Sequence, residues 1–299
     1  MTAPDEQSST IPAPREGRLE LPDERILAWR EYGPPEGRPV LRFQGTPGSR
    51  KSRHPHEESY VRLGARSLVF DRPGYGESTR LPGRGFAAVV DDAAQLLDDR
   101  GLDRVHVIGG SGGGPHVLAF AARHPERVLA ATVVVGGAPL EEADVQGLIG
   151  LNRAGWYAAQ QGWQALFDLL VPVREQVLRD PLAQFRSIMD TAPESDQEVM
   201  SDPDWQRVFL EDVTEALRPG AEGWTDESIL FARDWDFEPA DVGCSLAWWH
   251  GEGDANAPIS AVRRLLARMD GVDLRVWSDA GHFEPFRRHD EILAELLSR

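Results

Sequence analysis

The segment GGSGG at residues 109–113 constrains this chain more than any other feature of its sequence. It directly follows an apolar run, 105–108, typical of a buried strand, and it directly precedes a segment of helical periodicity that begins near Gly114. A serine on such a sharp strand-to-helix turn has a strained backbone, and small flanking residues leave room for it. The turn exposes the serine hydroxyl at the end of the sheet. We therefore interpret Ser111 as a catalytic nucleophile.

A glycine-rich turn can instead simply reverse the chain, or bind a phosphate group at a helix N-terminus. The segment has no lysine after its glycines, and it does not match the G-x-G-x-x-G pattern with a later acidic residue. These absences argue against a phosphate site.

The partners that a serine nucleophile needs occur later in the chain. A serine hydroxyl is a weak nucleophile at neutral pH, so it requires a base, and the base requires a carboxylate to fix its tautomer. Asp254 follows an apolar run at 244–249, and His282 lies just beyond a predicted last strand at 272–278. The order Ser, Asp, His with these strand contexts predicts that Asp254 and His282 converge on Ser111.

Other histidines and one acid compete for these roles. The histidines lie inside or beside predicted strands and helices, and we interpret them as structural. The rival acid lies less deep in its loop than Asp254, which favours Asp254. The rivals are His106, His116, His250 and Glu252.

Acyl transfer also requires hydrogen-bond donors aimed at the developing oxyanion. Two backbone N–H groups are candidates. One belongs to Gly112, immediately after the nucleophile, and the other belongs to Thr46 in the glycine-rich turn 44–48, which follows a predicted strand at 40–43.

The remaining pattern predicts an α/β fold. Apolar runs at 40–43, 67–70, 104–108, 129–135 and 244–249 alternate with helical segments such as 86–97 and 114–123. Two earlier strands, 17–21 and 26–32, follow one another without room for a helix and predict an antiparallel edge. We expect a disordered tail at 1–16, a core formed by 17–138 and 239–299, and a helical insertion at 139–238.

Five of the nine tryptophans lie in the predicted insertion. Packing between helices explains any single one of them more simply than substrate binding does. As a group they fit a cover whose apolar side chains point into a substrate cavity. We expect Trp156, Trp163 and Trp205 to line that cavity.

Charge and cysteine content exclude several partners. The formal net charge of -17 opposes binding to a nucleic acid backbone. A single cysteine, Cys244, allows neither an intrachain disulfide nor a cysteine metal cage. The N-terminal segment does not have the pattern of a secretory signal, and no apolar run is long enough to span a bilayer. We expect a cytoplasmic protein that acts on a small molecule without a metal or organic cofactor.

Four motifs together resemble the α/β-hydrolase superfamily, specifically its capped serine hydrolases. They are the oxyanion turn 44–48, D-R-P-G-x-G-x-S at 71–78, G-x-S-x-G at 109–113, and the late Gly281-His282 pair. The resemblance implies a mostly parallel, eight-stranded sheet flanked by helices, with a helical cap inserted after the sixth strand. Gln44 replaces the usual histidine of the oxyanion turn, and its amide can also donate and accept hydrogen bonds.

The resemblance leaves several activities open. Serine at the elbow disfavours the epoxide hydrolases and haloalkane dehalogenases of this fold, which use aspartate there. We favour hydrolysis of a carboxylic ester or lactone. The alternatives are an aminopeptidase of the prolyl type and a non-hydrolytic or C–C bond-cleaving enzyme. Acids of the insertion could receive a substrate ammonium group, although solvated helix faces explain them better; they are Glu194, Asp196, Glu198, Asp202, Asp204, Glu211 and Asp212.

Overall fold

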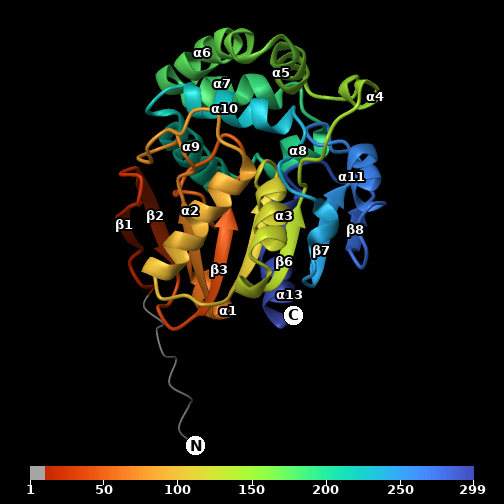
Figure 1. The fold of residues 1–299 in the computed structure, drawn as a ribbon. Helices are drawn as coiled ribbons and strands as arrows, with labels where there is room; N and C mark the ends of the chain where they lie inside the picture. Colours follow the sequence, from red (N-terminus) through yellow and green to blue (C-terminus); the bar gives the residue numbers. More distant parts are fainter. Residues whose placement is uncertain (1–10) are drawn as a thin grey trace, which may run out of the picture.

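A computed structural model describes residues 11–299, and its centre is one eight-stranded sheet (Figure 1). The strand order is β1-β2-β4-β3-β5-β6-β7-β8. The first two strands pair antiparallel, β2 pairs antiparallel with β4, and all later pairs are parallel. The strands are β1 (Arg15–Glu20), β2 (Ile26–Tyr32), β3 (Arg38–Phe43), β4 (Ala65–Phe70), β5 (Val105–Gly110), β6 (Val128–Val134), β7 (Leu246–Gly251) and β8 (Asp273–Trp277).

Helices cover both faces of this sheet. One apolar core lies between the sheet and α2 (Phe86–Asp99), α3 (Gly113–Arg123) and α11 (Ile259–Leu266). A second core lies on the other face, against α1 (Glu58–Leu63) and α13 (His289–Ser298). Because both faces are buried, the central strands carry continuous apolar runs rather than alternating ones. The mostly parallel α/β sheet predicted from the sequence is confirmed.

Seven further helices, α4 to α10, lie between β6 and β7 in the sequence, and we refer to them as the inserted helices. They gather above the carboxyl ends of the parallel strands (Figure 1). Two apolar clusters of their own hold them together. They are α4 (Glu142–Val145), α5 (Gly150–Gln161), α6 (Trp163–Arg179), α7 (Pro181–Met189), α8 (Glu194–Val199), α9 (Pro203–Leu217) and α10 (Glu222–Phe231); a short α12 (Glu284–Arg287) precedes α13.

The predicted end of the disordered N-terminal tail, at residue 16, is wrong. Arg15 and Glu16 belong to β1, where they lie opposite Glu31 and Arg30 of β2. Pairing with a neighbouring strand outweighs the polar composition of this segment. The first ten residues of the predicted tail lie outside the described residues. Within residues 11–299, no helix has the length and apolar character that crossing a membrane requires.

Candidate active site

Ser111 lies on the turn that joins β5 to α3, with a backbone φ of 53°. This left-handed conformation is rare for a residue with a side chain. The flanking glycines permit the turn, because a Cβ at Gly109 would lie 2.6 Å from Val117 and one at Gly113 would overlap the Phe43 carbonyl. Strained backbone of this kind typically persists where function requires it.

The three residues predicted to act with each other lie in hydrogen-bond contact. The Nε2 atom of His282 is 3.0 Å from Ser111 Oγ, and Nδ1 of the same ring is 2.8 Å from Asp254 Oδ2. Asp254 follows β7, and His282 follows β8. The carboxyl ends of three parallel strands thus hold the serine, the histidine and the carboxylate together.

The charges around His282 favour its protonated form. Burial opposes a positive imidazole, yet Asp254 and, more weakly, Asp196 raise the pKa of His282 above its ordinary value of 6.5. Burial likewise opposes the charge of Asp254, but His282 and nearby backbone donors lower its pKa. One of these donors is the N–H of Ala257, 2.8 Å from Asp254 Oδ1. The aspartate is therefore charged and fixed in orientation.

Three of the four rival residues have contacts with groups other than Ser111, and one of them, His250, also lies 3.5 Å from Asp254 Oδ2. His116 is buried with a pKa lowered to about 3, chiefly by burial and next by Arg72, and its Nδ1 lies 2.9 Å from the Gly112 carbonyl. His250 Nε2 lies 2.7 Å from the carbonyl of Ala257. Glu252 forms an exposed ion pair with Arg263.

Thr46 lies beside Gly112, and the preceding residue, Gly45, lies beside Ser111. A Cβ on Gly112 would overlap Thr46 Oγ1, and one on neighbouring Gly45 would lie 3.5 Å from the Cβ of Ser111. The N–H groups of Thr46 and Gly112 donate to no acceptor within residues 11–299. Both donors are therefore unused by the described residues near Ser111.

Gln44 holds the oxyanion turn in place. Its side chain is 2% exposed, and Nε2 lies 2.8 Å from the Phe70 carbonyl and 3.3 Å from that of Gly48. The glutamine thus donates two hydrogen bonds across this turn, whereas its buried Oε1 accepts none from residues 11–299.

Carboxylates of the inserted helices contact the loops of the candidate site, which the sequence did not predict. Asp196 of α8 is fully buried and accepts hydrogen bonds from the backbone N–H groups of His282 (3.0 Å) and Phe283 (2.8 Å). The expectation of a solvated helix face is wrong for this residue, because α8 packs against the loop that carries the histidine. Asp196 therefore fixes the backbone of the candidate base.

A second contact of this kind joins α10 to the oxyanion turn. Glu227 accepts a hydrogen bond from Thr46 Oγ1 at 2.6 Å. The same carboxylate is fully buried between Arg72, at 2.6 Å, and Arg84, at 3.1 Å, with Tyr75 donating to it at 2.9 Å. Burial opposes its charge, but the two arginines hold the pKa of Glu227 well below its usual range.

Asp212 of α9 makes a third contact. It accepts hydrogen bonds from the backbone N–H of Ser49, at 2.6 Å, and from the Ser49 hydroxyl, at 2.8 Å. Ser49 lies just after the oxyanion turn. Asp212 is therefore also bound to the core rather than solvated.

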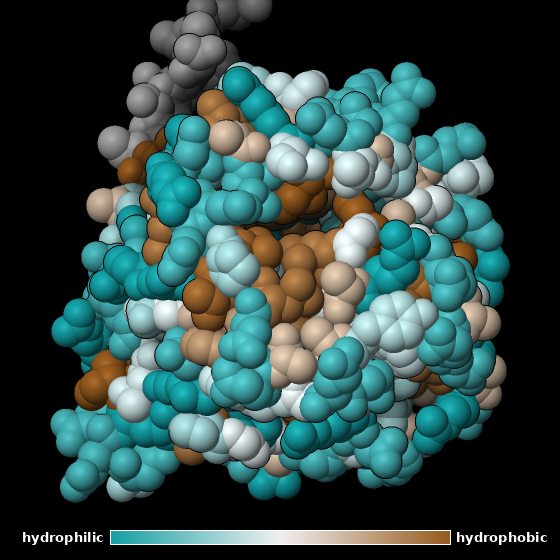
Figure 2. Space-filling model, turned by 90° about the horizontal axis from the view of Figure 1, so that it is seen from above, coloured by the Kyte–Doolittle hydropathy of each residue, from teal (hydrophilic) through white to brown (hydrophobic). Residues whose placement is uncertain are grey.

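Two cavities meet at Ser111. The smaller, of about 190 Å³, lies between Ser111 and the inserted helices, and Trp156 and Trp235 line it. The larger, of about 450 Å³, is lined by His282 and by Trp205, whose ring stacks on Phe286. Figure 2 shows the molecule from above, where hydrophobic residues line a hollow in a largely hydrophilic face. The cavities suit a substrate with apolar groups.

The prediction that three tryptophans line the substrate cavity is wrong for one of them. Trp163 lines neither cavity, because its ring stacks on Phe167 and its Nε1 donates to Asp226 at 2.6 Å. Arg80 lies over the same ring. Trp224, which the sequence analysis did not select, lines both cavities.

Comparisons with known proteins agree with this fold. A sequence model described as the alpha/beta hydrolase fold matches residues 38–286. A 2-hydroxy-6-oxononadienedioate/2-hydroxy-6-oxononatrienedioate hydrolase of Burkholderia vietnamiensis is 22% identical over 82% of this chain and 81% of its own.

Two solved structures are also similar. A thermophilic esterase of Thermogutta terrifontis has a TM-score of 0.65 and 21% identity, over 95% of this chain and 97% of its own. An enol-lactonase of Burkholderia xenovorans LB400 has a TM-score of 0.67 and 16% identity, over 95% of this chain and 100% of its own.

Proposed function

Since the chain belongs to the α/β-hydrolase family, we propose that it hydrolyses a carboxylic ester or lactone through an acyl-enzyme on Ser111. The observation that carries this proposal is the continuous hydrogen-bond path from Ser111 Oγ through His282 to Asp254, at 3.0 and 2.8 Å. The similarity to an esterase and an enol-lactonase supports the same class of reaction.

Each residue has one task in this mechanism. His282 Nε2 accepts the proton of Ser111, and Oγ attacks the substrate carbonyl carbon. The N–H groups of Thr46 and Gly112 donate to the oxyanion that forms. His282 then gives its proton to the departing oxygen, and a water molecule, activated by the same histidine, releases the acid. Asp254 keeps the Nδ1 proton of the imidazole in place and stabilises its positive charge.

We propose that the inserted helices act as a cap over a core formed by residues 15–138 and 239–299. The support is that residues of these helices, including Trp156, Trp205 and Trp224, line the cavities beside Ser111. The cap then supplies most of the apolar surface that a substrate contacts.

The contacts of the cap acids weaken the aminopeptidase alternative. A substrate ammonium group needs a carboxylate that is free to receive it. Asp196 and Asp212 lie nearest the catalytic loops, and both already accept two hydrogen bonds from core residues. Asp196 uses both of its oxygens in these bonds. Asp212 accepts both of its bonds on Oδ1, and burial raises its pKa to about 7, which makes it a weaker partner for a cation near neutral pH.

Hydrolysis of p-nitrophenyl esters of increasing acyl length by the wild type and by Ser111→Ala tests the proposal. We expect turnover by the wild type and loss of at least 10³-fold in the variant. Circular dichroism checks that both proteins are folded. Labelling with a fluorophosphonate, read by mass spectrometry, should modify Ser111. A folded wild type that neither hydrolyses any ester nor reacts with the probe would refute the proposal.

A further inference from the structure

The larger cavity is mainly apolar but contains a cation from the sheet. Aromatic residues such as Phe185, Phe209 and Phe283 line it, together with Arg42 of β3. A second arginine in the lining, Arg53, is ion-paired with Glu211 at 2.6 Å. The two cations therefore differ in how their charge is balanced.

Arg42 has no carboxylate within 4.0 Å among residues 11–299. Its side chain forms a single hydrogen bond to the described residues, from Nη2 to His289 Nε2 at 2.9 Å. Its buried Nε has no partner in the same part of the chain. Since a guanidinium carries five N–H donors, most of its capacity is unused.

The acid in the cavity lining does not neutralise this charge. Asp212 is directed at Ser49, and burial raises its pKa to about 7, which reduces its negative charge near neutral pH. A partly buried cation without a counter-charge is costly unless another group pairs with it.

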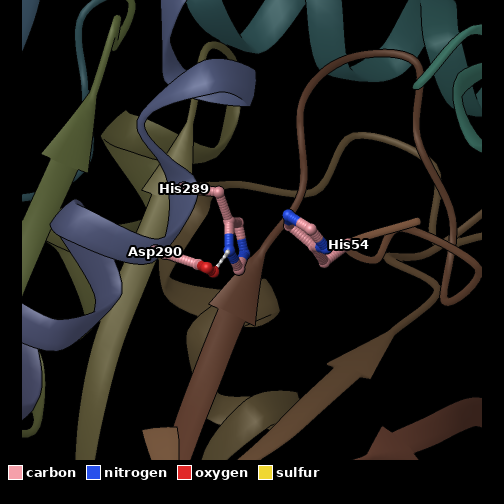
Figure 3. A group of neighbouring side chains, drawn as sticks. All are labelled: His54, His289 and Asp290. Atoms are coloured by element: carbon pink, nitrogen blue, oxygen red, sulfur yellow. Dashed lines mark hydrogen bonds and ion pairs between the residues drawn. The ribbon is translucent and has the colours of Figure 1, made fainter. Parts of the chain in front are cut away.

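The residues around Arg42 could suggest a metal site instead. His54, His289 and Asp290 have ligand atoms within 4.8 Å of one another, and Figure 3 shows the two imidazole rings facing each other beside the carboxylate. Burial lowers the pKa of His289 to about 3, so its ring is neutral and has one nitrogen lone pair.

His289 uses that lone pair to accept from Arg42. Its protonated Nδ1 then faces Asp290, at 3.4 Å, as the dashed line in Figure 3 marks. Asp290 also accepts from Ser59 and Arg62. The positive charge of Arg42 further disfavours a metal ion here. His289 and Asp290 therefore orient the guanidinium of Arg42 rather than bind a metal ion.

We propose that Arg42 binds a carboxylate carried by the substrate, in the larger cavity. This inference rests on the proposed ester hydrolysis. A carboxylate matches the planar fork of a guanidinium and forms charge-assisted hydrogen bonds with it. The apolar lining accommodates the hydrocarbon segment between the ester and the acid.

The position of His282 assigns this carboxylate to the departing alcohol. His282 must protonate the leaving oxygen, and it lines the larger cavity but not the smaller one. Arg42 lies opposite Ile108 in the sheet register, three residues before Ser111 along β5. At about 3.3 Å per residue, this places the two backbones about 10 Å apart along the strand direction. The substrate class is thus an ester of a hydroxy acid with several bonds between its two functional groups.

The test compares acetate esters of ω-hydroxy acids, four to ten carbons long, with the corresponding primary amides. The amide has nearly the same shape but no charge. Released acetate is measured for the wild type, Arg42→Met, Arg42→Lys and the control Arg38→Met, an exposed arginine on the same strand. We expect the wild type to favour the acid by about 10- to 100-fold in kcat/KM at the best length.

The variants distinguish this preference from general damage. Arg42→Met should lose the preference for the acid yet still release acetate from the esters that carry an amide. Arg42→Lys should retain part of the preference, and Arg38→Met should retain all of it. If Arg42→Met does not fold, the wild type and Arg42→Lys still give the answer. The inference is overturned if the wild type releases acetate equally well from the acid esters and the amide esters. It is also overturned if the Arg42 variants keep the preference for the acid unchanged. Failure to hydrolyse any ester would instead remove the proposed function itself.

Discussion

Replacement of Asp196 by asparagine tests whether the inserted helices set the geometry of the base. The aspartate accepts two backbone hydrogen bonds, from His282 and Phe283, at a fully buried position. Asparagine has the same shape but one acceptor oxygen, so one N–H then faces an amide NH2 group. Losing one hydrogen bond to a charged acceptor costs about 1.5–3 kcal/mol. If the transition state bears this cost, kcat/KM falls by about 10- to 150-fold.

The pH profile distinguishes positioning of the base from a purely structural role. Only neutral His282 can accept the proton of Ser111, so kcat/KM falls as the pH decreases through the pKa of this histidine. Burial opposes the protonated form, whereas Asp254 and Asp196 raise that pKa above 6.5. Removing the charge of Asp196 should therefore move the acid limb of the profile to lower pH.

Asp202→Asn is the matched control for this experiment. Asp202 also accepts two backbone hydrogen bonds, from Asp204 and Trp205, but it is exposed at the start of α9. The Asp202→Asn substitution should change stability slightly and leave kcat/KM and its pH profile unaltered. Ester hydrolysis from pH 5 to 9 gives both quantities. If Asp196→Asn keeps kcat/KM within twofold of the wild type, with an unmoved acid limb, the reasoning is refuted.

Two further predictions concern the buried carboxylates. Asp254→Asn removes the charge that orients His282, so kcat in ester hydrolysis should fall by about 10⁴-fold. The unfolding transition of the variant should resemble that of the wild type. A loss of kcat below tenfold would contradict the role of Asp254. Glu227→Gln leaves two buried arginines without their anion, so the free energy of unfolding in a urea titration should fall by about 3–5 kcal/mol. An unchanged unfolding midpoint would show that Glu227 does not compensate these charges.

The alternation of strands and helices, and the candidate site residues just after the strands, could be predicted because both depend on local patterns. Apolar runs bounded by glycine identified the strands, and the short segments after them carried Ser111, Asp254 and His282. Parallel strands end at the same edge of a sheet. Side chains on the short segments directly after these strands therefore come together there. Details at element ends were less accurate, since β1 begins within the predicted tail.

Contacts between the inserted helices and the core could not be predicted in the same way. Asp196 lies 86 residues from His282, and Glu227 lies 181 residues from Thr46. Helical periodicity identifies helices, but it does not fix which side of each faces a distant loop. Trp163 was misassigned for this reason, because its side of α6 meets Asp226 rather than a cavity.

The three carboxylates of the inserted helices that hold catalytic loops have a consequence for engineering. Asp196 is bonded to the loop after β8, whereas Asp212 and Glu227 are bonded to Ser49 and Thr46 in the loop after β3. A chimera that receives a foreign insertion at residues 139–238 would lose all three attachments at once. Transplanting specificity into this scaffold therefore requires the carboxylates to be kept while the surrounding helix surfaces are redesigned.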